Sequence, residues 1–218
     1  MKKVISFSIW GSNPKYTLPA LTNIELAEKY YPGWTCRFYH DMRVPQEILD
    51  QIDSMGAERR SLPNPDGNYG MFWRFYPADD MSVDQFIVRD TDSRLNPREA
   101  DAVMEWEESD KRFHTMRDNI HHDPVPVCGG MWGAKKGFVD NFQMKLVNWI
   151  KANSHRAFGH PRGKWFYMDQ VFLKESIWPL VVNKSMAHTS YESQWGGLKK
   201  PFRVENPDGS FVGQPYES

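Results

Sequence analysis

The stretch Phe86-Ile87-Val88-Arg89-Asp90-Thr91-Asp92-Ser93-Arg94 joins an apolar run to a cluster of charged side chains. The run at 86–88 is typical of a strand buried on both faces, as in a parallel sheet. Two aspartates follow it, two positions apart. Because such side chains point the same way in an extended chain, we expect Asp90 and Asp92 to converge at the carboxyl end of this strand.

A convergent pair of carboxylates makes a hard oxygen site that suits Mg²⁺ or Mn²⁺. Such an ion typically bridges protein carboxylates and substrate phosphates, and it stabilises a leaving diphosphate. Arg89 and Arg94 flank the pair and are expected to donate charge-assisted hydrogen bonds to phosphate. The competing interpretation is a polar strand end capped by turn residues, because an Asp-x-Asp pattern alone is short and unspecific.

Extended and helical patterns alternate on both sides of this strand. Extended runs are expected at 2–10, 34–39 and 180–182, and helices at 18–31, 45–54, 70–78, 138–151 and 165–177. A further helix begins after Asn96, which is followed by Pro97 at the first helical position and by Glu99 in a capping box. The alternation predicts an α/β layered sheet, in which ligands bind at the carboxyl ends of the strands.

Composition narrows the function classes. The chain has 218 residues, a formal net charge of -1 and no long run of Lys or Arg, so we expect no nucleic-acid partner and no membrane span. The apolar run after Lys2 and Lys3 is too short for a secretory signal and is interrupted by serines. Two cysteines cannot form a disulfide framework, and free thiols suit a reducing compartment. We therefore expect a cytoplasmic protein.

Asp169 is unusual because its neighbours on the expected helix are all apolar. An Asp on an apolar stripe is costly unless it is paired or hydrogen-bonded, and such residues are often functional. One interpretation is a catalytic carboxylate that faces a reacting sugar, with Gln170 bonding to hydroxyl groups. The other is a buried Asp that caps a loop or pairs with an Arg. The apolar neighbours are Trp165, Phe166, Phe172 and Leu173.

Several less specific features follow in the second half of the chain. His121 and His122 precede a Pro-rich turn and predict a polar loop, either lining a sugar site or solvated. Gly129-Gly130 permits close approach of the backbone to a ligand, or a tight turn into a strand. Trp132 offers an aromatic face that suits a sugar ring, although most aromatic residues belong to cores. His188 is a candidate metal ligand, although a lone His is more often structural.

The order of these features resembles the glycosyltransferases of the GT-A fold, the nucleotide-diphospho-sugar transferase superfamily. The Asp90-Thr91-Asp92 segment looks like their metal-binding DxD motif, and Arg74 is placed like a basic residue that contacts the donor. Gly129-Gly130 is similar to their GG element, and Met168-Asp169-Gln170 to the acidic element of several retaining families. His188, with residues 199–202 after it, is similar to a terminal stretch whose His is a third metal ligand, although the spacing here is longer.

The resemblance implies a single GT-A (Rossmann-like) domain over 1–218, with a mixed, mostly parallel sheet flanked by helices. Residues 1–95 would bind the nucleotide sugar, with Trp10, Gly11, Ser12 and Tyr16 at the base and ribose. Residues 96–202 would bind the acceptor and supply catalysis, and 203–218 would form an irregular tail. Small members encoded by large viruses and phages, such as a chlorella-virus capsid glycosyltransferase domain, look most similar, which implies the host cytoplasm for a viral protein.

The implied reaction moves a sugar from a nucleotide diphosphate, with UDP favoured, to a glycan or glycoprotein, assisted by Mn²⁺ or Mg²⁺. Two other functions stay open on the residues alone. A metal-dependent phosphohydrolase or nucleotidyltransferase would use the same carboxylates. A non-catalytic sugar-binding module would need neither nucleotide nor metal.

Overall fold

The computed structural model describes residues 1–216 and is built on one sheet of eight strands. The strands are β1 (Lys3–Ile9), β2 (Trp34–His40), β3 (Glu58–Ser61), β4 (Gln85–Arg89), β5 (Phe113–Arg117), β6 (Met131–Lys135), β7 (Ser185–Thr189) and β8 (Leu198–Lys200). Their order is β3-β2-β1-β4-β6-β5-β7-β8. Strand β6 runs antiparallel to both of its neighbours, and the other paired strands are parallel. The expected mixed, mostly parallel sheet is confirmed.

The strand order reverses between β1 and β4. From β1 the chain builds outward through β2 and β3 on one side, and then returns to pair β4 with the other side of β1. Such a reversal leaves a crevice at the carboxyl ends of the two strands, since the connections after them leave in opposite directions. The fold therefore places a ligand site directly after Ile9 and Arg89.

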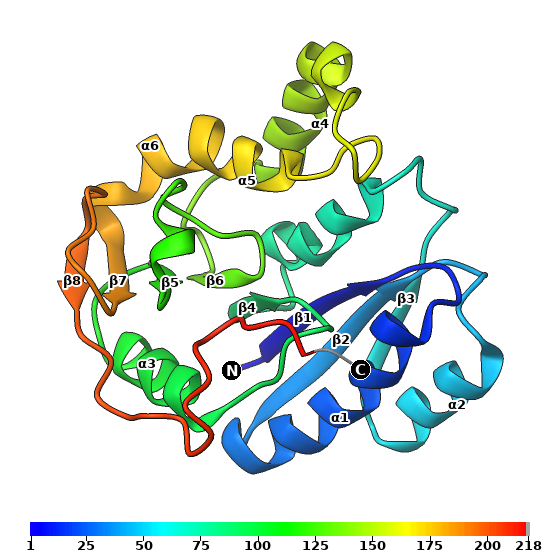
Figure 1. Cartoon of the computed structure of the whole chain (residues 1–218), viewed down its shortest axis with the longest axis horizontal. Coiled ribbons are helices and arrows are strands. Elements are labelled where there is room, and N and C mark those ends of the chain that lie inside the picture. The colour runs from blue at the N-terminus through cyan, green and yellow to red at the C-terminus, as the bar shows by residue number, and fades with distance from the viewer. Residues whose placement is uncertain (217–218) are drawn as a thin grey trace.

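Helices cover both faces of the sheet (Figure 1). One face carries α1 (Pro14–Tyr30), α2 (Gln46–Ser54) and α3 (Pro97–Glu107). The other carries the 3-10 helix η1 (Tyr69–Asp79), α4 (Phe142–Asn153), α5 (Met168–Phe172), the π-helical turn η4 (Leu173–Ile177) and α6 (Trp178–Val181). Short 3-10 turns lie at η2 (Ile120–His122), η3 (Ser154–Ala157) and η5 (Val182–Lys184). Asn96 caps α3 as expected, with its side chain accepting from the Glu99 N–H at 3.0 Å, but the Glu99 side chain binds Tyr31 and Arg89 and does not complete the expected capping box.

Each face of the sheet has its own hydrophobic core. Aliphatic side chains dominate beneath α1 and α2, where Phe7 stacks on Phe38 with ring centroids 5.0 Å apart. Aromatic side chains dominate on the other face, around a fully buried Trp132 whose ring lies 5.3 Å from that of Phe75. Because so large a side chain fills this core, Trp132→Ala is expected to cost about 3–5 kcal/mol. The expectation that Trp132 faces a sugar is therefore wrong.

Several expected elements differ in type or extent: α1 begins four residues earlier and α4 four residues later than predicted, and two larger differences have a clear local cause. Residues 180–182 are helical rather than extended, because Pro179 sits in the first turn of α6, where its missing N–H costs no hydrogen bond. The late strand is instead β7. The helix expected at 165–177 begins only at Met168, because Trp165 and Tyr167 adopt left-handed φ of 67° and 70°.

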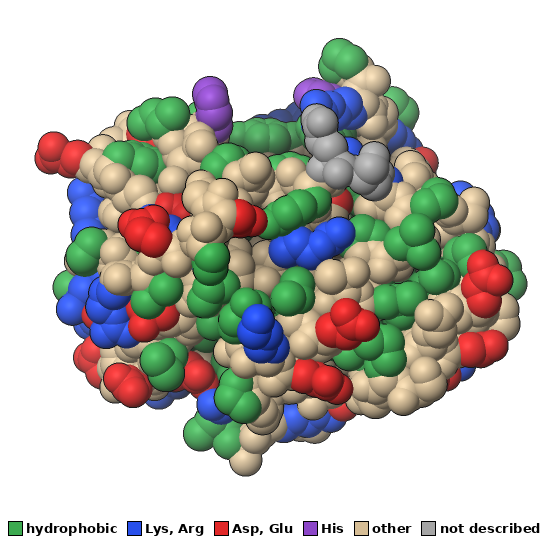
Figure 2. All heavy atoms as spheres, turned by 60° about the horizontal axis from the view of Figure 1, so that its bottom comes forward, with side chains coloured by type: hydrophobic (Ala, Val, Ile, Leu, Met, Phe, Trp, Pro, Cys, Tyr) green, Lys and Arg blue, Asp and Glu red, His purple; other side chains and the backbone are tan. Residues whose placement is uncertain are grey.

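Two surface properties of the described residues bear on partners. None of the helices within 1–216 combines the length and apolar character needed to cross a bilayer. On the face in Figure 2, acidic and basic side chains are interspersed.

Candidate active site

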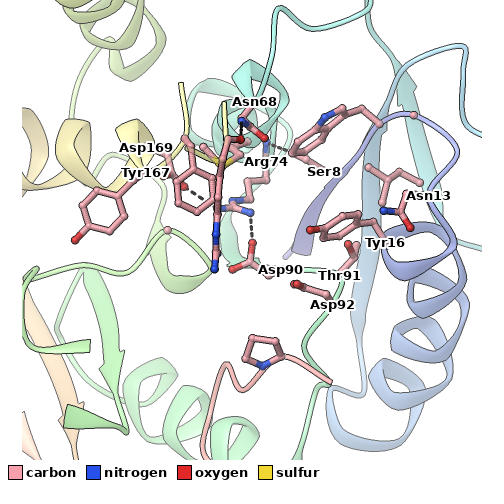
Figure 3. A pocket seen from close by; sticks show the side chains of 18 of the residues that line it. Ser8, Asn13, Tyr16, Asn68, Arg74, Asp90, Thr91, Asp92, Tyr167 and Asp169 are labelled. Carbon is pink, nitrogen blue, oxygen red and sulfur yellow. Dashed lines mark hydrogen bonds and ion pairs between the residues drawn. The ribbon is translucent and has the colours of Figure 1, made fainter. Parts of the chain in front are cut away.

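A cavity of about 650 Å³ opens where the sequence order of the strands reverses. One wall comes from the end of β1 and the start of α1, and the opposite wall comes from the segment that leads into α5 (Figure 3). Asp90 and Asp92, which follow β4, and Arg74 of η1 lie between the two walls (Figure 3). Predicted residues that line the cavity are Trp10, Gly11, Ser12, Tyr16, Arg74, Asp90, Thr91, Asp92, Gly129, Asp169 and Gln170.

The acidic pair is held in a turn rather than in an extended strand. Strand β4 ends at Arg89, and residues 91–92 form a turn. The buried Asn23 of α1 fixes this turn by donating to the carbonyl oxygens of Thr91 at 3.1 Å and Ser93 at 2.9 Å. Asp90 and Asp92 both line one cavity, but the turn, and not the alternation of an extended strand, places them there.

Arg74 joins two of the acidic groups across the cavity floor. Its Nη2 lies 2.8 Å from Oδ2 of Asp169, and its Nη1 donates to Oδ1 of Asp90. The Arg74 and Asp169 side chains are buried, whereas that of Asp90 is 45% exposed. The backbone N–H of Arg74 donates to Oγ of Ser8 at 2.9 Å, which ties η1 to the end of β1. The interpretation of Asp169 as a buried Asp paired with an Arg is therefore confirmed, and the same side chain lines the cavity.

The charges of this cluster shift one another's protonation. Burial raises the pKa of Asp169, Arg74 lowers it in part, and the negative charge of Asp90 raises it further. Burial, then the charge of Asp90, raises the pKa of Asp92. Burial works to lower the pKa of Arg74, but the two carboxylates outweigh it and the pKa is raised. Three carboxylates against one guanidinium leave this part of the cavity electronegative, which suits a cation.

Two adjacent glycines leave space for the carboxylates. A Cβ on Gly129 would lie 2.2 Å from Oδ2 of Asp169 and 2.8 Å from Nη2 of Arg74. A Cβ on Gly130 would lie 2.0 Å from Oδ2 of Asp90. Ordinary contacts are 3.4 Å or longer, so any side chain at either position displaces an acidic group. The predicted tight turn into a strand is also present, because residues 129–130 form a turn directly before β6 and the Met131 N–H donates to the Cys128 carbonyl at 3.1 Å.

The donor set fits a hard divalent ion. Residues 1–216 contain no group of three or more His, Cys, Asp or Glu side chains arranged to hold a metal. Among the described residues, three carboxylates line the cavity: Asp90 and Asp169, which both bind Arg74, and Asp92, which forms no ion pair. Mg²⁺ is usually held in this manner, by one or two carboxylates, waters and substrate phosphates.

His188 does not complete that set. It lies in β7, whose neighbours β5 and β6 separate it from β4. Three strand spacings of about 4.8 Å place it ~14 Å away from β4. Its Nδ1 is 2.8 Å from Nε2 of His114, and its Nε2 is 3.3 Å from a Glu105 oxygen. The prediction of a third metal ligand is therefore wrong, and the buried side chain has a structural role.

Five other predicted site residues do not line the cavity, namely Gly130, which contacts the back of Asp90, and the four described next. The buried Arg89 pairs with Glu99 at 3.2 Å, and Arg94 lies over the ring of Tyr216. His121 and His122 belong to η2, where Nδ1 of His122 accepts backbone N–H groups at 3.2 and 3.3 Å. Arg89 cannot contact a phosphate in the cavity because its side chain is buried in the core, where it pairs with Glu99 of α3.

Several other residues line the cavity that were not predicted from the sequence. The wall that leads into α5 includes Arg162, Phe166 and Tyr167. The tail also contributes, since Tyr216 N–H donates to the Asp92 carbonyl at 2.9 Å and Pro215 pairs with Ser93. The basic residues flanking glycines at 159–163 were visible in the sequence, but their place opposite the acidic pair depends on the fold. The remaining lining residues are Ser8, Ile9, Asn13, Arg43, Asn68, Met71 and Gly213.

Comparison with known proteins identifies the fold. No family model matches the sequence, and no curated protein matches it. The structure is similar to the glycosyltransferase GlyE of Streptococcus pneumoniae TIGR4, with a TM-score of 0.57 and 14% identity over 85% of this chain. It is also similar to a glycosyltransferase involved in glycosylation of the major capsid of PBCV-1, with a TM-score of 0.50 and 18% identity over 87% of this chain.

A third similar structure is 4-diphosphocytidyl-2C-methyl-D-erythritol synthase from Anaerococcus prevotii DSM 20548, with a TM-score of 0.51 and 8% identity over 90% of this chain. The matches span 44%, 82% and 91% of the streptococcal, viral and Anaerococcus chains respectively. At these identities the likeness is one of fold. The chain accordingly has the α/β fold of the GT-A-type glycosyltransferases, as the sequence predicted.

Proposed function

We propose that this protein is a glycosyltransferase that moves a sugar from a nucleotide diphosphate, UDP by preference, to a glycan or glycoprotein acceptor. The observation that carries the proposal is the joining of Asp90, Asp92 and Asp169 in one cavity, with Arg74 between two of them. Two of the similar folds belong to proteins named as glycosyltransferases. The buried free thiols of Cys36 and Cys128 are compatible with a reducing compartment, and we place the enzyme in the cytoplasm.

In this proposal the wall formed by β1 and α1 holds the nucleotide. Tyr16 is 40% exposed and presents an aromatic ring to the cavity, which suits a nucleobase or ribose. Asp90 and Asp92 hold Mn²⁺ or Mg²⁺ against the diphosphate. The ion, when bound, neutralises the charge that develops on the leaving nucleotide diphosphate.

Arg74 and Asp169 act at the sugar. The guanidinium holds the Asp169 carboxylate in one orientation, and its position beside Asp90 lets it donate to a diphosphate oxygen that reaches the cavity floor. The buried carboxylate stabilises positive charge at the anomeric carbon as the glycosidic bond to the diphosphate breaks. Gln170 lines the cavity beside it and bonds to sugar hydroxyl groups.

A nucleotidyltransferase is the second candidate. Its support is the similarity to the diphosphocytidyl-methylerythritol synthase, which extends over nearly all of both chains. This reaction would use Asp90 and Asp92 for the same cation, but it breaks a phosphoanhydride bond and releases pyrophosphate. No bond at the anomeric carbon breaks in that reaction, so Asp169 would have no role in it. A role for Asp169 therefore favours the glycosyltransferase.

The test is a thermal-shift panel of UDP, GDP, CMP and dTDP, each with and without Mn²⁺. A ligand that binds only the folded state raises the melting temperature by mass action. The proposal predicts a shift with one nucleoside diphosphate that requires Mn²⁺ and disappears in Asp92→Asn. If none of the nucleotides shifts the wild-type protein, donor binding is refuted, and a non-catalytic sugar-binding module becomes the better account.

A further inference from the structure

The wall opposite the nucleotide side is formed by an unusually basic part of the chain. Residues 141–168 contain no Asp or Glu, but they include five cationic side chains in a protein whose formal net charge is -1. The five are Lys145, Lys151, Arg156, Arg162 and Lys164. Residues 158–167 connect η3 to α5, and Arg162, Phe166 and Tyr167 of this connection line the cavity.

Among the Lys and Arg residues that line the cavity in the described part of the chain, Arg162 differs from Arg43 and Arg74 in having no acidic partner. Arg43 pairs with Asp41 at 2.5 Å, and Arg74 pairs with two carboxylates. Within residues 1–216, the exposed Arg162 forms no ion pair, although its side chain lines the cavity. A guanidinium left free beside a cavity is available to a ligand.

An aromatic shelf holds that guanidinium in place. The Arg162 guanidinium lies 5.2 Å from the centroid of the Phe166 ring, and the His160 ring stacks on Phe166 with centroids 4.4 Å apart. The backbone N–H of Arg162 donates to Nδ1 of His160 at 3.1 Å. Arg stacked on an aromatic face keeps its planar fork free for a phosphate or carboxylate, and it loses little conformational freedom on binding.

The shelf is presented by a strained but anchored backbone. Trp165 and Tyr167, on either side of Phe166, both have left-handed φ, which is costly for large side chains. The strain is held by Asn68, whose Nδ2 donates to the carbonyl oxygens of Arg162 at 3.0 Å and Lys164 at 3.1 Å. The Trp165 side chain is also buried in the core, and the Trp165 backbone N–H donates to the Ala157 carbonyl at 2.8 Å. Backbone held in such a conformation is characteristic of binding sites.

We propose that the acceptor of this enzyme carries a compact anionic group, a phosphate or a carboxylate, which binds to Arg162 on the shelf of Phe166 and His160. The inference rests on the proposed function, because it assigns this wall to the acceptor. The opposite wall, with Tyr16 and Asn13, is then left to the nucleotide (Figure 3). The same chemistry would also suit a phosphate of the donor, so the experiment must separate the two sources.

The experiment titrates glucose 6-phosphate, glucuronate and glucose into the full-length protein by calorimetry, with UDP and Mn²⁺ present and with both absent. The wild-type protein is expected to bind the two anionic probes about tenfold or more tighter than glucose, the range of a hydrogen bond to a charged group. Arg162→Gln is expected to abolish that preference. Arg162→Lys keeps the charge but not the fork, and should restore only part of it.

The matched control is Arg156→Gln, which removes a cation of the same segment that pairs with Glu175 at 3.0 Å and does not line the cavity. It should leave the preference unchanged. Affinity for UDP, titrated separately, should change less than twofold in Arg162→Gln. A large loss of UDP affinity would assign the anion to the donor and overturn the proposal, as would equal binding of glucose and the anionic probes. Failure of the wild-type protein to bind any nucleoside diphosphate would instead refute the proposed function. That outcome is measured in the nucleotide titration, separately from the titrations of the sugar probes.

Discussion

Gly130→Ala tests whether the glycine pair leaves room for Asp90, the acidic group that we propose holds the cation. The new methyl group would start 2.0 Å from Oδ2 and 2.6 Å from Cγ of Asp90. Reaching the ordinary contact distance of 3.4 Å requires the carboxylate to move by 1.4 Å. Because Mg²⁺ tolerates only a narrow range of oxygen distances, this displacement removes Asp90 from the cation.

The loss is expected in binding rather than in stability. The Asp90 side chain is 45% exposed, so it can turn toward solvent without leaving a buried charge. A partly exposed ion pair contributes about 0.2–1 kcal/mol, and replacing Gly by Ala at an unstrained position returns about 0.4–1 kcal/mol. We therefore expect a nearly unchanged melting temperature. Displacing a group that positions or supplies ligation typically weakens metal binding about 10–100-fold, and the Mn²⁺-dependent affinity for UDP should fall by that factor.

Gly129→Ala is the matched comparison. Its methyl group would start 2.2 Å from Asp169, which is buried and held by Arg74, so neither group can move to solvent. This variant is expected to lose about 3–5 kcal/mol of stability as well, the cost of breaking a buried pair. Gly196→Ala is the control for the glycine substitution itself, because Gly196 is exposed, has no left-handed φ, and its new methyl group would meet only the Val182 Cγ2 atom, at 3.0 Å. Calorimetry with UDP and Mn²⁺ measures all three, and undiminished cation-dependent binding in Gly130→Ala would refute the reasoning.

Three further predictions concern single Asp→Asn substitutions. Because the pKa of Asp92 is raised in the folded protein, its ionised form is destabilising at neutral pH, and the penalty fades as pH falls toward the ordinary pKa of 3.8. Asp92→Asn should therefore raise the melting temperature of the cation-free protein at pH 7 by more than at pH 4, and an equal gain at both pH values would contradict this. Asp169→Asn leaves Arg74 paired with Asp90, so KM for the donor should stay the same. The kcat for sugar transfer should fall about 100-fold or more, and an unchanged kcat would exclude Asp169 from the reaction. Asp118→Asn should lower the free energy of unfolding by about 3–5 kcal/mol, measured by urea unfolding. Asp118 accepts two hydrogen bonds of 2.8 Å from the buried Arg98 and one from the Val212 N–H of the tail. A loss below about 1 kcal/mol would show that this pair does not hold the tail.

The parts of the site that could be predicted from sequence are those with a local cause. A buried apolar run followed by two aspartates signals a strand end and its acidic turn without any knowledge of the rest of the chain. The start of α3 was equally visible, because Asn96 and Pro97 act only on the residues next to them. Asp169 was recognised because a charge among apolar neighbours is conspicuous in the sequence itself.

The parts that failed depend on contacts between distant residues. Whether a lone histidine such as His188 reaches a metal is decided by which strands separate it from β4, and sequence spacing does not contain that order. Val181 and Val182 have β-branched side chains, but packing of this helical segment against the aromatic core outweighs their extended preference. The left-handed Trp165 and Tyr167 have no local signature, since Asn68 and the core impose their conformation. The Gly-rich and Pro-rich tail looked irregular, and its path to Asp92 is set by Asp118.

The most direct test of the central claim is to identify the product released from the nucleotide. The protein is incubated with Mn²⁺ and either a panel of nucleotide sugars with a mixed acceptor fraction, or nucleoside triphosphates with sugar phosphates. We predict release of a nucleoside diphosphate from one nucleotide sugar, dependent on Mn²⁺ and lost in Asp92→Asn. Release of pyrophosphate from a triphosphate, with every nucleotide sugar left intact, would contradict the account and identify a nucleotidyltransferase.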